Sequence, residues 1–580
     1  MFNAGDLSPA FFILLLRSRF VIFDMESLTP RQTSGPTHLL DAFRITSLRF
    51  PDQVALKANG GLGKQYTYRE AYSLSARLAT ALHHSLPHDI TTIGLLSENR
   101  PEWPIIYLGI VGAGRTVVPI DANLKPTELI SIIRLSGIRV LFTSDRFESY
   151  LVSNLPELTV HSLESTSARS WLSLLIHPPA QIEVDPDRLA VLIYTSGTTG
   201  SPSAVTLTHR NLLGNLDGIR PALPFDSDDI FLSVLPLHHT LEATCGFLAP
   251  LTSGSGVVYA RSLKSKEILE DIAHNKVTVM CGVPLLFEKM HHAIRRGIQA
   301  SSLPRRLTFH LIYAALSLGW RLGFKWGRPL FRSLRQQAGL SSIRMLVSGG
   351  AAIPVETARF YNLIGLDFLQ GYGMTECSPV VSVNRPDNIQ FGSVGPPLPN
   401  LEVRIDQPDE HGIGEIVVKG PSITSGYRDN EAKTAELLRN GWLHTGDLGR
   451  IHHGHLWITG RLKNVIVSAA GKNIYPEELE EHLLESPYVS EAIVFGRLKI
   501  ARQGEEVRAL IVPDLDQFRT EFSFSSEAPD LERIKVILTQ QVEQVNRRLA
   551  DYKRISGFDF QLEELEKTST RKLKRFIYTA

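Results

Sequence analysis

The sequence has few cysteines, almost no net charge and no long apolar run. Its three cysteines, Cys245, Cys281 and Cys377, are scattered along 580 residues, which excludes a disulfide framework and favours a reducing compartment. The formal net charge of +1 argues against nucleic-acid binding by bulk electrostatics. No stretch reaches the roughly 18 uninterrupted apolar residues that a membrane-spanning helix requires. We therefore expect a cytoplasmic protein without a transmembrane helix or a nucleic-acid partner.

The first 24 residues differ in composition from the rest. An apolar run at 10–16 is followed by Arg17 and Arg19, which is too short to span a bilayer. It also lacks the small-residue cleavage site of a signal peptide. Two interpretations remain open, a surface anchor and a true start of translation at Met25. We treat 1–24 as an uncertain apolar and basic leader.

The remaining chain has the composition of a globular protein and the length for two domains. Apolar residues make up 43% and charged residues 21%, and 580 residues exceed what one hydrophobic core usually holds. Helical segments alternate with short apolar strands such as 92–96 and 138–142, which predicts an open α/β sheet. After residue 460 we expect two further strands, 491–495 and 507–512, and a helix at 531–549. We predict an α/β protein divided into a domain at 25–462 and a smaller one at 463–580.

A loop rich in Ser, Thr and Gly follows the predicted strand 189–194. Its glycines let backbone N–H groups converge on an anion, and its hydroxyls add donors without adding bulk. No Gly-Lys-Ser/Thr follows at the offset of the common P-loop. A flexible linker has the same composition, but the position directly after an apolar strand argues against one. We predict a polyphosphate-binding loop that contains Thr195, Ser196, Gly197, Thr198, Thr199 and Gly200.

Five further segments follow the loop in order. They are Leu235-Pro-Leu-His-His-Thr-Leu-Glu242, Ser348-Gly-Gly-Ala-Ala-Ile-Pro354, Gln370-Gly-Tyr-Gly-Met-Thr-Glu376, Gly441-Trp-Leu-His-Thr-Gly-Asp447 and Gly460-Arg-Leu-Lys463. The ordered set resembles the AMP-binding, adenylate-forming superfamily of acyl-CoA synthetases, luciferases and peptide-synthetase adenylation domains, and above all the long-chain fatty acyl-CoA synthetases. The resemblance implies a large N-terminal domain of stacked mixed sheets and helices and a small, mobile α+β C-terminal domain.

The resemblance also implies a role for individual residues. Thr375 would contact the α-phosphate, Glu376 and Thr195 would hold Mg²⁺, Asp447 would bind the ribose, and His239 would gate the acyl site. A carboxylate accepts hydrogen bonds from both ribose hydroxyls, and a carboxylate is also a hard ligand that suits magnesium. The remaining implied contacts to nucleotide or CoA are Gly349, Gly350, Ala351, Gly371, Tyr372, Gly373, Met374, Arg461, Lys463, Gly471 and Lys472.

Lys572 ends the segment Glu566-Lys-Thr-Ser-Thr-Arg-Lys572. By resemblance this lysine bridges the substrate carboxylate and the α-phosphate of ATP. The C-terminal domain then turns at Lys463 and presents 467–473 to the incoming thiol. We expect a long-chain fatty acid:CoA ligase that forms AMP. An enzyme that loads the phosphopantetheine of an acyl carrier protein is the alternative.

Two positions depart from the family pattern. Ser203 and Ala204 stand where the family generally has Lys-Gly, so the phosphate loop has lost its cation. Arg571 stands where the family usually has glycine before the catalytic lysine. A catalytically impaired lipid- or nucleotide-binding relative therefore remains a second alternative.

The stretch from 290 to 355 contains ten Lys and Arg residues and no Asp or Glu, interleaved with aromatic residues. Aromatic and basic residues on amphipathic helices favour an anionic membrane surface, although a helix pair with a solvated basic face would look the same. We expect a fatty acid substrate and peripheral membrane contact through 290–340. Two other patterns are assigned to turns, His452-His-Gly-His455 to a hairpin and Gly112-Ala-Gly114 to a helix end.

Overall fold

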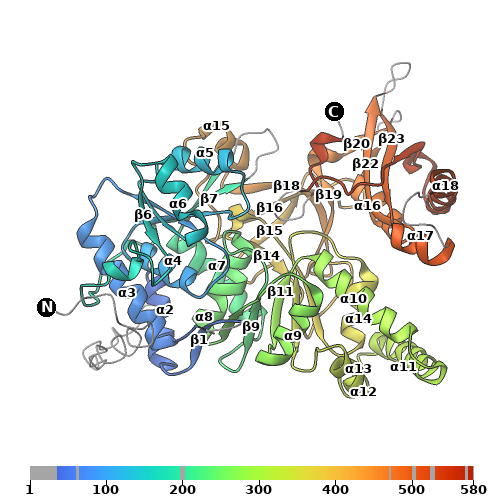
Figure 1. Cartoon of the computed structure of the whole chain (residues 1–580). Coiled ribbons are helices and arrows are strands. Elements are labelled where there is room, and N and C mark those ends of the chain that lie inside the picture. The colour runs from blue at the N-terminus through green and yellow to red at the C-terminus, as the bar shows by residue number, and fades with distance from the viewer. Residues whose placement is uncertain are drawn as a thin grey trace.

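The computed structural model describes residues 35–59, 64–195, 203–468, 472–498, 505–522, 530–567 and 573–578, and all structural statements below refer to these. Figure 1 shows a large body, blue to yellow along the chain, and a smaller orange and red body that holds the C-terminus. The leader at 1–24 lies outside the described residues.

The first large sheet has six described strands in the order β6-β5-β3-β4-β7-β8. Most neighbours pair in parallel, and β8 is antiparallel to β7. The central strands are buried along their whole length, as expected for parallel strands with helices on both faces. The predicted strands 92–96, 138–142 and 189–194 are confirmed. The strands are β3 Thr92–Leu96, β4 Thr116–Ile120, β5 Val140–Thr143, β6 Thr159–Ser162, β7 Leu189–Thr195 and β8 Ser203–Thr208, with helices α3 Tyr68–Ser85, α4 Glu102–Gly112, α5 Pro126–Ser136 and α6 Asp145–Asn154.

The second large sheet has eight described strands in the order β14-β13-β12-β11-β9-β10-β1-β2. Its edge strands β14 and β2 are antiparallel and its centre is parallel. The strands are β1 Val54–Ala58, β2 Gln65–Thr67, β9 Ile230–Ser233, β10 Gly256–Tyr259, β11 Val279–Gly282, β12 Met345–Ser348, β13 Asp367–Gly373 and β14 Val380–Val383. Its helices are α2 Leu39–Arg49, α7 His209–Ala222, α8 Ala249–Ser253, α9 Ser265–Asn275, α10 Pro284–Gln299, α11 Leu303–Arg321, α12 Gly327–Leu330, α13 Arg332–Gln337 and α14 Val355–Leu363.

The two large sheets share one hydrophobic core. Side chains from α4, α7 and both sheets belong to the same buried cluster, which includes Trp103, Tyr107 and Phe247. The rings of Trp103 and Tyr107 stack with centroids 5.2 Å apart. Helix α4 is buried on all sides, which explains its uniformly apolar sequence. It ends at Gly112, and Gly114 follows with a φ of +69°, so the predicted helix-end turn is confirmed.

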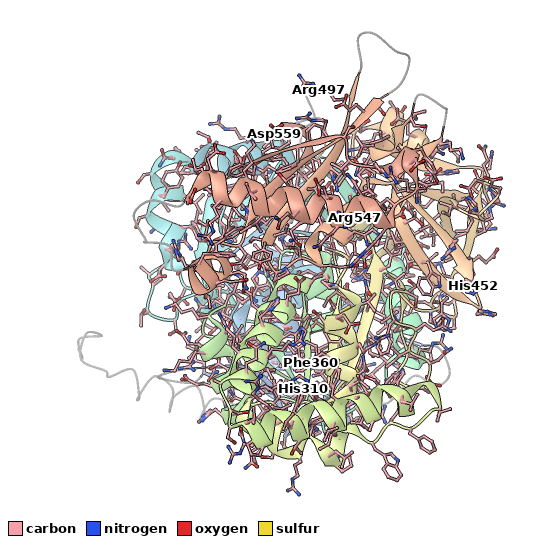
Figure 2. The ribbon with its side chains drawn as sticks, turned by 90° about the vertical axis from the view of Figure 1, so that its right-hand side faces the viewer. His310, Phe360, His452, Arg497, Arg547 and Asp559 are labelled. Atoms are coloured by element: carbon pink, nitrogen blue, oxygen red, sulfur yellow. The ribbon has the colours of Figure 1, made fainter. Side chains whose placement is uncertain are left out.

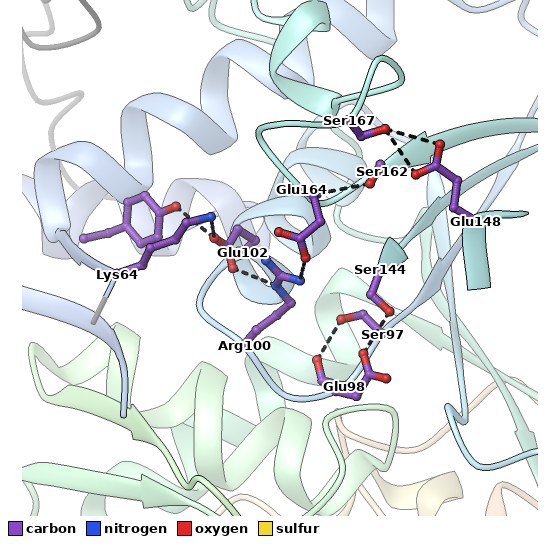
Figure 3. A network of polar contacts seen from close by, with 11 residues as sticks. Lys64, Ser97, Glu98, Arg100, Glu102, Ser144, Glu148, Ser162, Glu164 and Ser167 are labelled. Atoms are coloured by element: carbon purple, nitrogen blue, oxygen red, sulfur yellow. Dashed lines mark hydrogen bonds and ion pairs between the residues drawn. The ribbon is translucent and has the colours of Figure 1, made fainter. Parts of the chain in front are cut away.

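A buried polar network crosses this core beside α4 (Figure 3). The Glu102 carboxylate, 2% exposed, accepts from Lys64 at 3.0 Å and from Arg100 at 2.8 Å, and Arg100 also pairs with Glu164 at 2.5 Å. Burial raises the pKa of Glu102, but Arg100 and Lys64 outweigh burial and the net pKa is lowered. The network therefore keeps this carboxylate ionised inside the protein.

A smaller antiparallel sheet leads from the large body to the C-terminal body. It contains β15 Glu402–Asp406, β16 Gly414–Lys419, β17 Leu438–Arg439, β18 Trp442–His452 and β19 His455–Arg461, with α15 Glu431–Leu437 beside it. His453 and Gly454 connect β18 to β19 with φ values of +48° and +77°. The predicted hairpin at 452–455 is therefore confirmed.

The C-terminal body has its own sheets and its own core. Side chains of α16, α18, β22 and β23 form a buried cluster separate from the core of the large body. The predicted strands 491–495 and 507–512 and the helix at 531–549 are confirmed. The elements are β20 Ile466–Val467, β21 Asn473–Ile474, α16 Pro476–Leu484, β22 Val489–Leu498, β23 Glu505–Pro513, α17 Leu515–Phe522, α18 Leu531–Arg548 and β24 Gly557–Phe560.

Helices α10 to α13 form a projecting edge of the large body. Figure 2 shows α11, marked by His310, along the underside of the protein, below Phe360 of α14. The inner face of α11 packs through Phe309 and Tyr313 against Phe331 and Phe360. None of the helices in the described ranges has both the length and the apolar character that crossing a bilayer requires.

Candidate active site

The predicted polyphosphate loop leaves the sheet at the carboxyl end of β7 and returns in β8. Thr195 and Ser203 are the last paired residues of the two strands, and the Thr195 hydroxyl donates to the Ser203 carbonyl at 3.3 Å. Both ends of the loop are therefore held together at one sheet edge. The predicted loop residues Ser196, Gly197, Thr198, Thr199 and Gly200 lie outside the described residues.

Two further predicted segments meet at the ends of β12 and β13. These strands are parallel neighbours with Ser348 opposite Gln370, so the segments after them start side by side. Gly350 has a φ of +87°, which favours glycine. A Cβ on Gly373 would lie 1.9 Å from the Pro379 carbonyl oxygen, so only glycine fits there. The structure thus brings together the predicted residues Gly349, Gly350, Ala351, Gly371, Tyr372, Gly373 and Met374.

Asp447 lies buried between two side chains that orient it. The Tyr372 hydroxyl donates to Oδ2 at 2.7 Å, and the Arg461 Nε donates to Oδ1 at 2.8 Å. Burial and the neighbouring Asp447 carboxylate raise the pKa of Tyr372 well above its usual range, so the phenol stays protonated and donates. Each carboxylate oxygen can accept more than one hydrogen bond. The arrangement presents an oriented acceptor pair, as binding of a ribose diol requires.

The predicted catalytic residues Thr375 and Glu376 follow Tyr372 closely in the sequence. The Thr240 and Thr375 hydroxyls are 3.2 Å apart. The Tyr427 hydroxyl donates to Glu376 Oε1 at 2.7 Å, and burial together with this carboxylate raises the pKa of Tyr427 above its usual range. Glu376 is itself buried. The Glu376 carboxyl group is therefore held through Tyr427, which an isolated β-bridge pairs with Val205 of β8.

The predicted gate residue His239 lies directly before Thr240. Its ring centroid is 4.0 Å from that of His238, and His238 Nε2 is 3.6 Å from the Asp121 carboxylate. Burial lowers the pKa of His238. The histidine pair therefore lines the same region as Thr375.

The predicted hinge segment at 460–463 lies where the two bodies meet, and Lys472 points elsewhere. The Lys463 side chain reaches solvent but is partly shielded by neighbouring residues, and this shielding together with the Arg461 charge lowers its pKa. The Lys472 ammonium lies 4.8 Å from the centroid of the Tyr552 ring within the C-terminal body. The described contacts of Lys472 therefore do not bring it to Asp447. Gly471 and Lys572 lie outside the described residues.

The chain matches two family descriptions along most of its length. "AMP-binding enzyme" covers residues 43–428, and "AMP-binding enzyme C-terminal domain" covers residues 463–575. The chain belongs to the AMP-binding enzyme family.

Relatives of this AMP-binding enzyme include ligases for several kinds of acid. It is 30% identical over 484 residues to long chain acyl-CoA synthetase 6, peroxisomal, of Arabidopsis thaliana, with 76% of this chain and 68% of that protein covered. It is 30% identical over 529 residues to long-chain-fatty-acid–CoA ligase FadD15 of Mycobacterium bovis, with 83% and 85% covered. It is also 30% identical over 459 residues to feruloyl-CoA synthase of Amycolatopsis sp, with 78% and 84% covered.

Solved structures show the same fold. ATP-bound MatB from Rhodopseudomonas palustris superposes with a TM-score of 0.74 at 23% identity, covering 94% of this chain and 98% of that one. MenE of Bacillus subtilis with ATP and magnesium ion superposes with a TM-score of 0.70 at 24% identity, covering 94% and 99%. The predicted α/β fold of mixed sheets and helices with an additional domain of strands and helices is confirmed.

The AMP-binding enzyme is an ATP-dependent acid–CoA ligase that uses ATP and CoA. Its described residues fit magnesium, because the Glu376 carboxylate and the Thr195 hydroxyl are hard oxygen donors near the phosphate loop. No cluster of three or more His, Cys, Asp or Glu side chains able to hold a metal occurs in the described ranges. Glu376 and Thr195 would therefore hold the ion together with phosphate oxygens, which neutralises charge on the nucleotide.

Two residues of the AMP-binding enzyme's site were missed in the sequence. Tyr427 binds Glu376 and Thr240 contacts Thr375, and no chemistry was assigned to either position. Tyr427 reaches the site because an isolated β-bridge pairs it with Val205. Tyr427 and Val205 lie far apart in the sequence, so no sequence motif indicated that Tyr427 belongs to the site. Thr240 directly follows the predicted gate residue His239, and this neighbouring position could have indicated its place in the site.

Proposed function

We propose that this enzyme activates long-chain fatty acids. The carboxylate of the acid attacks the α-phosphorus of ATP, pyrophosphate leaves, and the acyl-adenylate then transfers its acyl group to the CoA thiol with release of AMP. Long-chain acyl-CoA synthetases among the relatives support this proposal, although a relative named for feruloyl-CoA is as similar. Features of the chain itself have to discriminate between these acids.

The observation that carries the proposal is a small apolar cavity that reaches Val347, two residues before Gly349. Leu241 lies at van der Waals distance from the position that a Cβ on Gly349 would take, and Val347 of β12 forms part of the cavity wall. The lining contains no charged side chain. It consists of Ile219, Leu223, Phe225, Phe231, Cys245, Ala249, Val279, Cys281, Met345 and Val347.

The chemistry of this wall favours an alkyl tail. A phenolic hydroxyl buried against these side chains would lose its hydrogen bonds to water and gain none, which costs about 1–3 kcal/mol. An alkyl chain gains about 0.8 kcal/mol for each buried CH₂ group. The cavity measures only about 10 Å³, which is too small for an alkyl chain, so the proposal requires flanking side chains such as Leu223 and Met345 to shift when the acid binds.

We also infer that α11 and the segment after it contact an anionic membrane surface. Large apolar side chains on this edge face solvent, with Leu311 72%, Leu318 65%, Leu322 70% and Trp326 64% exposed. The same region is rich in Lys and Arg and has no acidic residue from 290 to 355. Apolar residues that enter the interface, surrounded by cations that attract acidic lipids, are typical of peripheral membrane proteins.

Acid-dependent exchange of labelled pyrophosphate into ATP tests the substrate. We expect palmitate and oleate to support exchange with a higher kcat/KM than octanoate, ferulate or indoleacetate. The Lys572→Ala variant should lose exchange with every acid. A preference for ferulate would refute the fatty acid proposal, and no exchange with any acid would favour the impaired relative. Competition between CoA and a phosphopantetheinylated acyl carrier protein then identifies the acceptor.

Co-sedimentation with vesicles tests the membrane contact. We expect binding to vesicles of phosphatidylcholine and phosphatidylglycerol and little binding to phosphatidylcholine alone. The double variant Leu311→Gln and Leu318→Gln should weaken this binding at least about tenfold. The two leucines, exposed in the free protein, would become buried in the bilayer and stabilise the bound state by several kcal/mol. Leu135→Gln, at a leucine of α5 that is 58% exposed, is the matched control. Equal binding by both variants would contradict the proposal.

A further inference from the structure

Lys433 of α15 is fixed beside the returning end of the phosphate loop. The segment before α15 runs along β8, where the Arg428 N–H donates to the Ala204 carbonyl at 2.9 Å. The helix then begins after Asn430, whose side chain accepts from the Lys433 N–H at 3.0 Å. Strand pairing and a helix cap thus hold the Lys433 backbone close to Ser203.

The Lys433 side chain points toward this end of the loop. Its ammonium donates to the Ser203 hydroxyl at 2.6 Å and lies 4.6 Å from the centroid of the Tyr427 ring. Tyr427 in turn donates to Glu376, and the Ser203 carbonyl accepts from Thr195. A continuous chain of contacts therefore connects the Lys433 ammonium with both predicted magnesium ligands.

The charge of Lys433 has no acidic partner within the described part of the chain. No described carboxylate lies within ion-pairing distance, and its hydrogen-bonded contact is a neutral hydroxyl. An ammonium has three hydrogens to donate, and Ser203 takes one of them. A partly buried ammonium with donors to spare favours an anion as its next partner.

We propose that Lys433 binds the β- and γ-phosphates of ATP and so supplies, from α15, the cation that positions 203 and 204 lack. When pyrophosphate leaves, it takes both electrons of the broken P–O bond, and a neighbouring ammonium stabilises the charge on its oxygens. The proposal rests on the use of ATP by the enzyme and is independent of which acid is activated. It also explains how a phosphate loop without lysine remains functional.

A purely structural role for Lys433 would be to tie α15 to β8. The two roles differ in the ligands that they affect. A phosphate-binding lysine changes the affinity for ATP and pyrophosphate and leaves the affinity for AMP unchanged, because AMP has no β- or γ-phosphate. A structural lysine changes all three affinities together, because Tyr427 and Glu376 would shift with α15.

Calorimetric titration of the full chain with Mg·ATP, Mg·pyrophosphate and AMP separates these roles. We expect Lys433→Ala to weaken binding of ATP and pyrophosphate roughly 10- to 100-fold, the value of one charge-assisted hydrogen bond, and to change AMP binding less than about twofold. Lys433→Met keeps the apolar stem over Tyr427 and should give the same pattern if the alanine variant is unstable. Lys419→Ala, at an exposed lysine of β16, is the control and should behave as wild type.

Moving the cation back to the loop provides the second test. In the Lys433→Ala background, Ser203→Lys should restore ATP affinity to within about fivefold of wild type, because the ammonium returns to the same region from the other side. Unchanged ATP affinity in Lys433→Ala and Lys433→Met, or a parallel loss for AMP, would overturn the proposal. None of these titrations requires a fatty acid, so they stand whether or not the substrate proposal holds.

Discussion

Replacing Glu242 by glutamine should remove a pH dependence from the stability of the large body. Glu242 opens the π-helix Glu242–Leu248 and is 1% exposed. A Cβ added to residue 246 would lie 2.3 Å from the Glu242 Oε1 atom. Only glycine at position 246 therefore leaves room for the Glu242 carboxyl group. Neither oxygen has a hydrogen-bond partner of ordinary geometry among the described residues. Burial raises the pKa of Glu242 to about 8 and outweighs the opposing effects of Ser233 and the Leu235 backbone.

The size of the effect follows from the two pKa values. In the unfolded chain Glu242 ionises near 4.5, and in the folded protein near 8. Because the pKa of Glu242 is higher in the folded protein than in the unfolded chain, this residue contributes fully to the free energy of unfolding below the unfolded pKa. That contribution is lost as the pH rises through the folded pKa. At about 1.4 kcal/mol per pKa unit, wild type should lose about 3 kcal/mol more than Glu242→Gln between roughly pH 5.5 and pH 8.

Urea unfolding followed by tryptophan fluorescence measures this difference. All six tryptophans precede residue 463, so the signal reports the large body even though the chain has more than one domain. Glu157→Gln, at an exposed glutamate, controls for the general effect of removing one carboxylate. If wild type and Glu242→Gln lose stability in parallel with rising pH, Glu242 does not ionise in this range in the folded state.

Three further substitutions have expected outcomes that separate binding from stability. Asp447→Asn should weaken ATP and AMP by the same factor, about tenfold, because both carry the ribose; calorimetry checks this, and a selective loss for ATP would contradict it. Tyr427→Phe leaves Glu376 without its hydrogen bond and should raise the Mg²⁺ concentration for half-maximal exchange at least about threefold, measured by magnesium titration; an unchanged requirement would refute a role at the metal. Glu102→Gln removes the buried carboxylate that Arg100 and Lys64 share in the network of Figure 3, although Arg100 keeps Glu164, and should lower the free energy of unfolding by about 3 kcal/mol; a loss below about 1 kcal/mol in urea would show that this carboxylate does not stabilise the fold.

Much of the fold could be predicted from local patterns. Strands 92–96 and 189–194 were recognisable because buried parallel strands are uniformly apolar, and the turn at 452–455 because its residues suit a tight reversal. The positions of the chemical groups were partly predictable, since Asp447 and Glu376 lie in ordered segments. Their orientation was not, because it depends on partners such as Tyr372 and Tyr427 that come from other parts of the chain.

The sequence by itself indicated which chemistry to expect, a predicted phosphate loop followed by ordered segments predicted to bind a nucleotide, because turn residues and apolar runs act through neighbours along the chain. Only the tertiary structure decided which side chain supplies charge or orientation at each point. Tyr372 meets Asp447 across 75 residues, and Lys433 meets Ser203 across 230 residues. Such pairs arise where strands pair and helices begin, so a cation absent from the loop in sequence is present beside the loop in space.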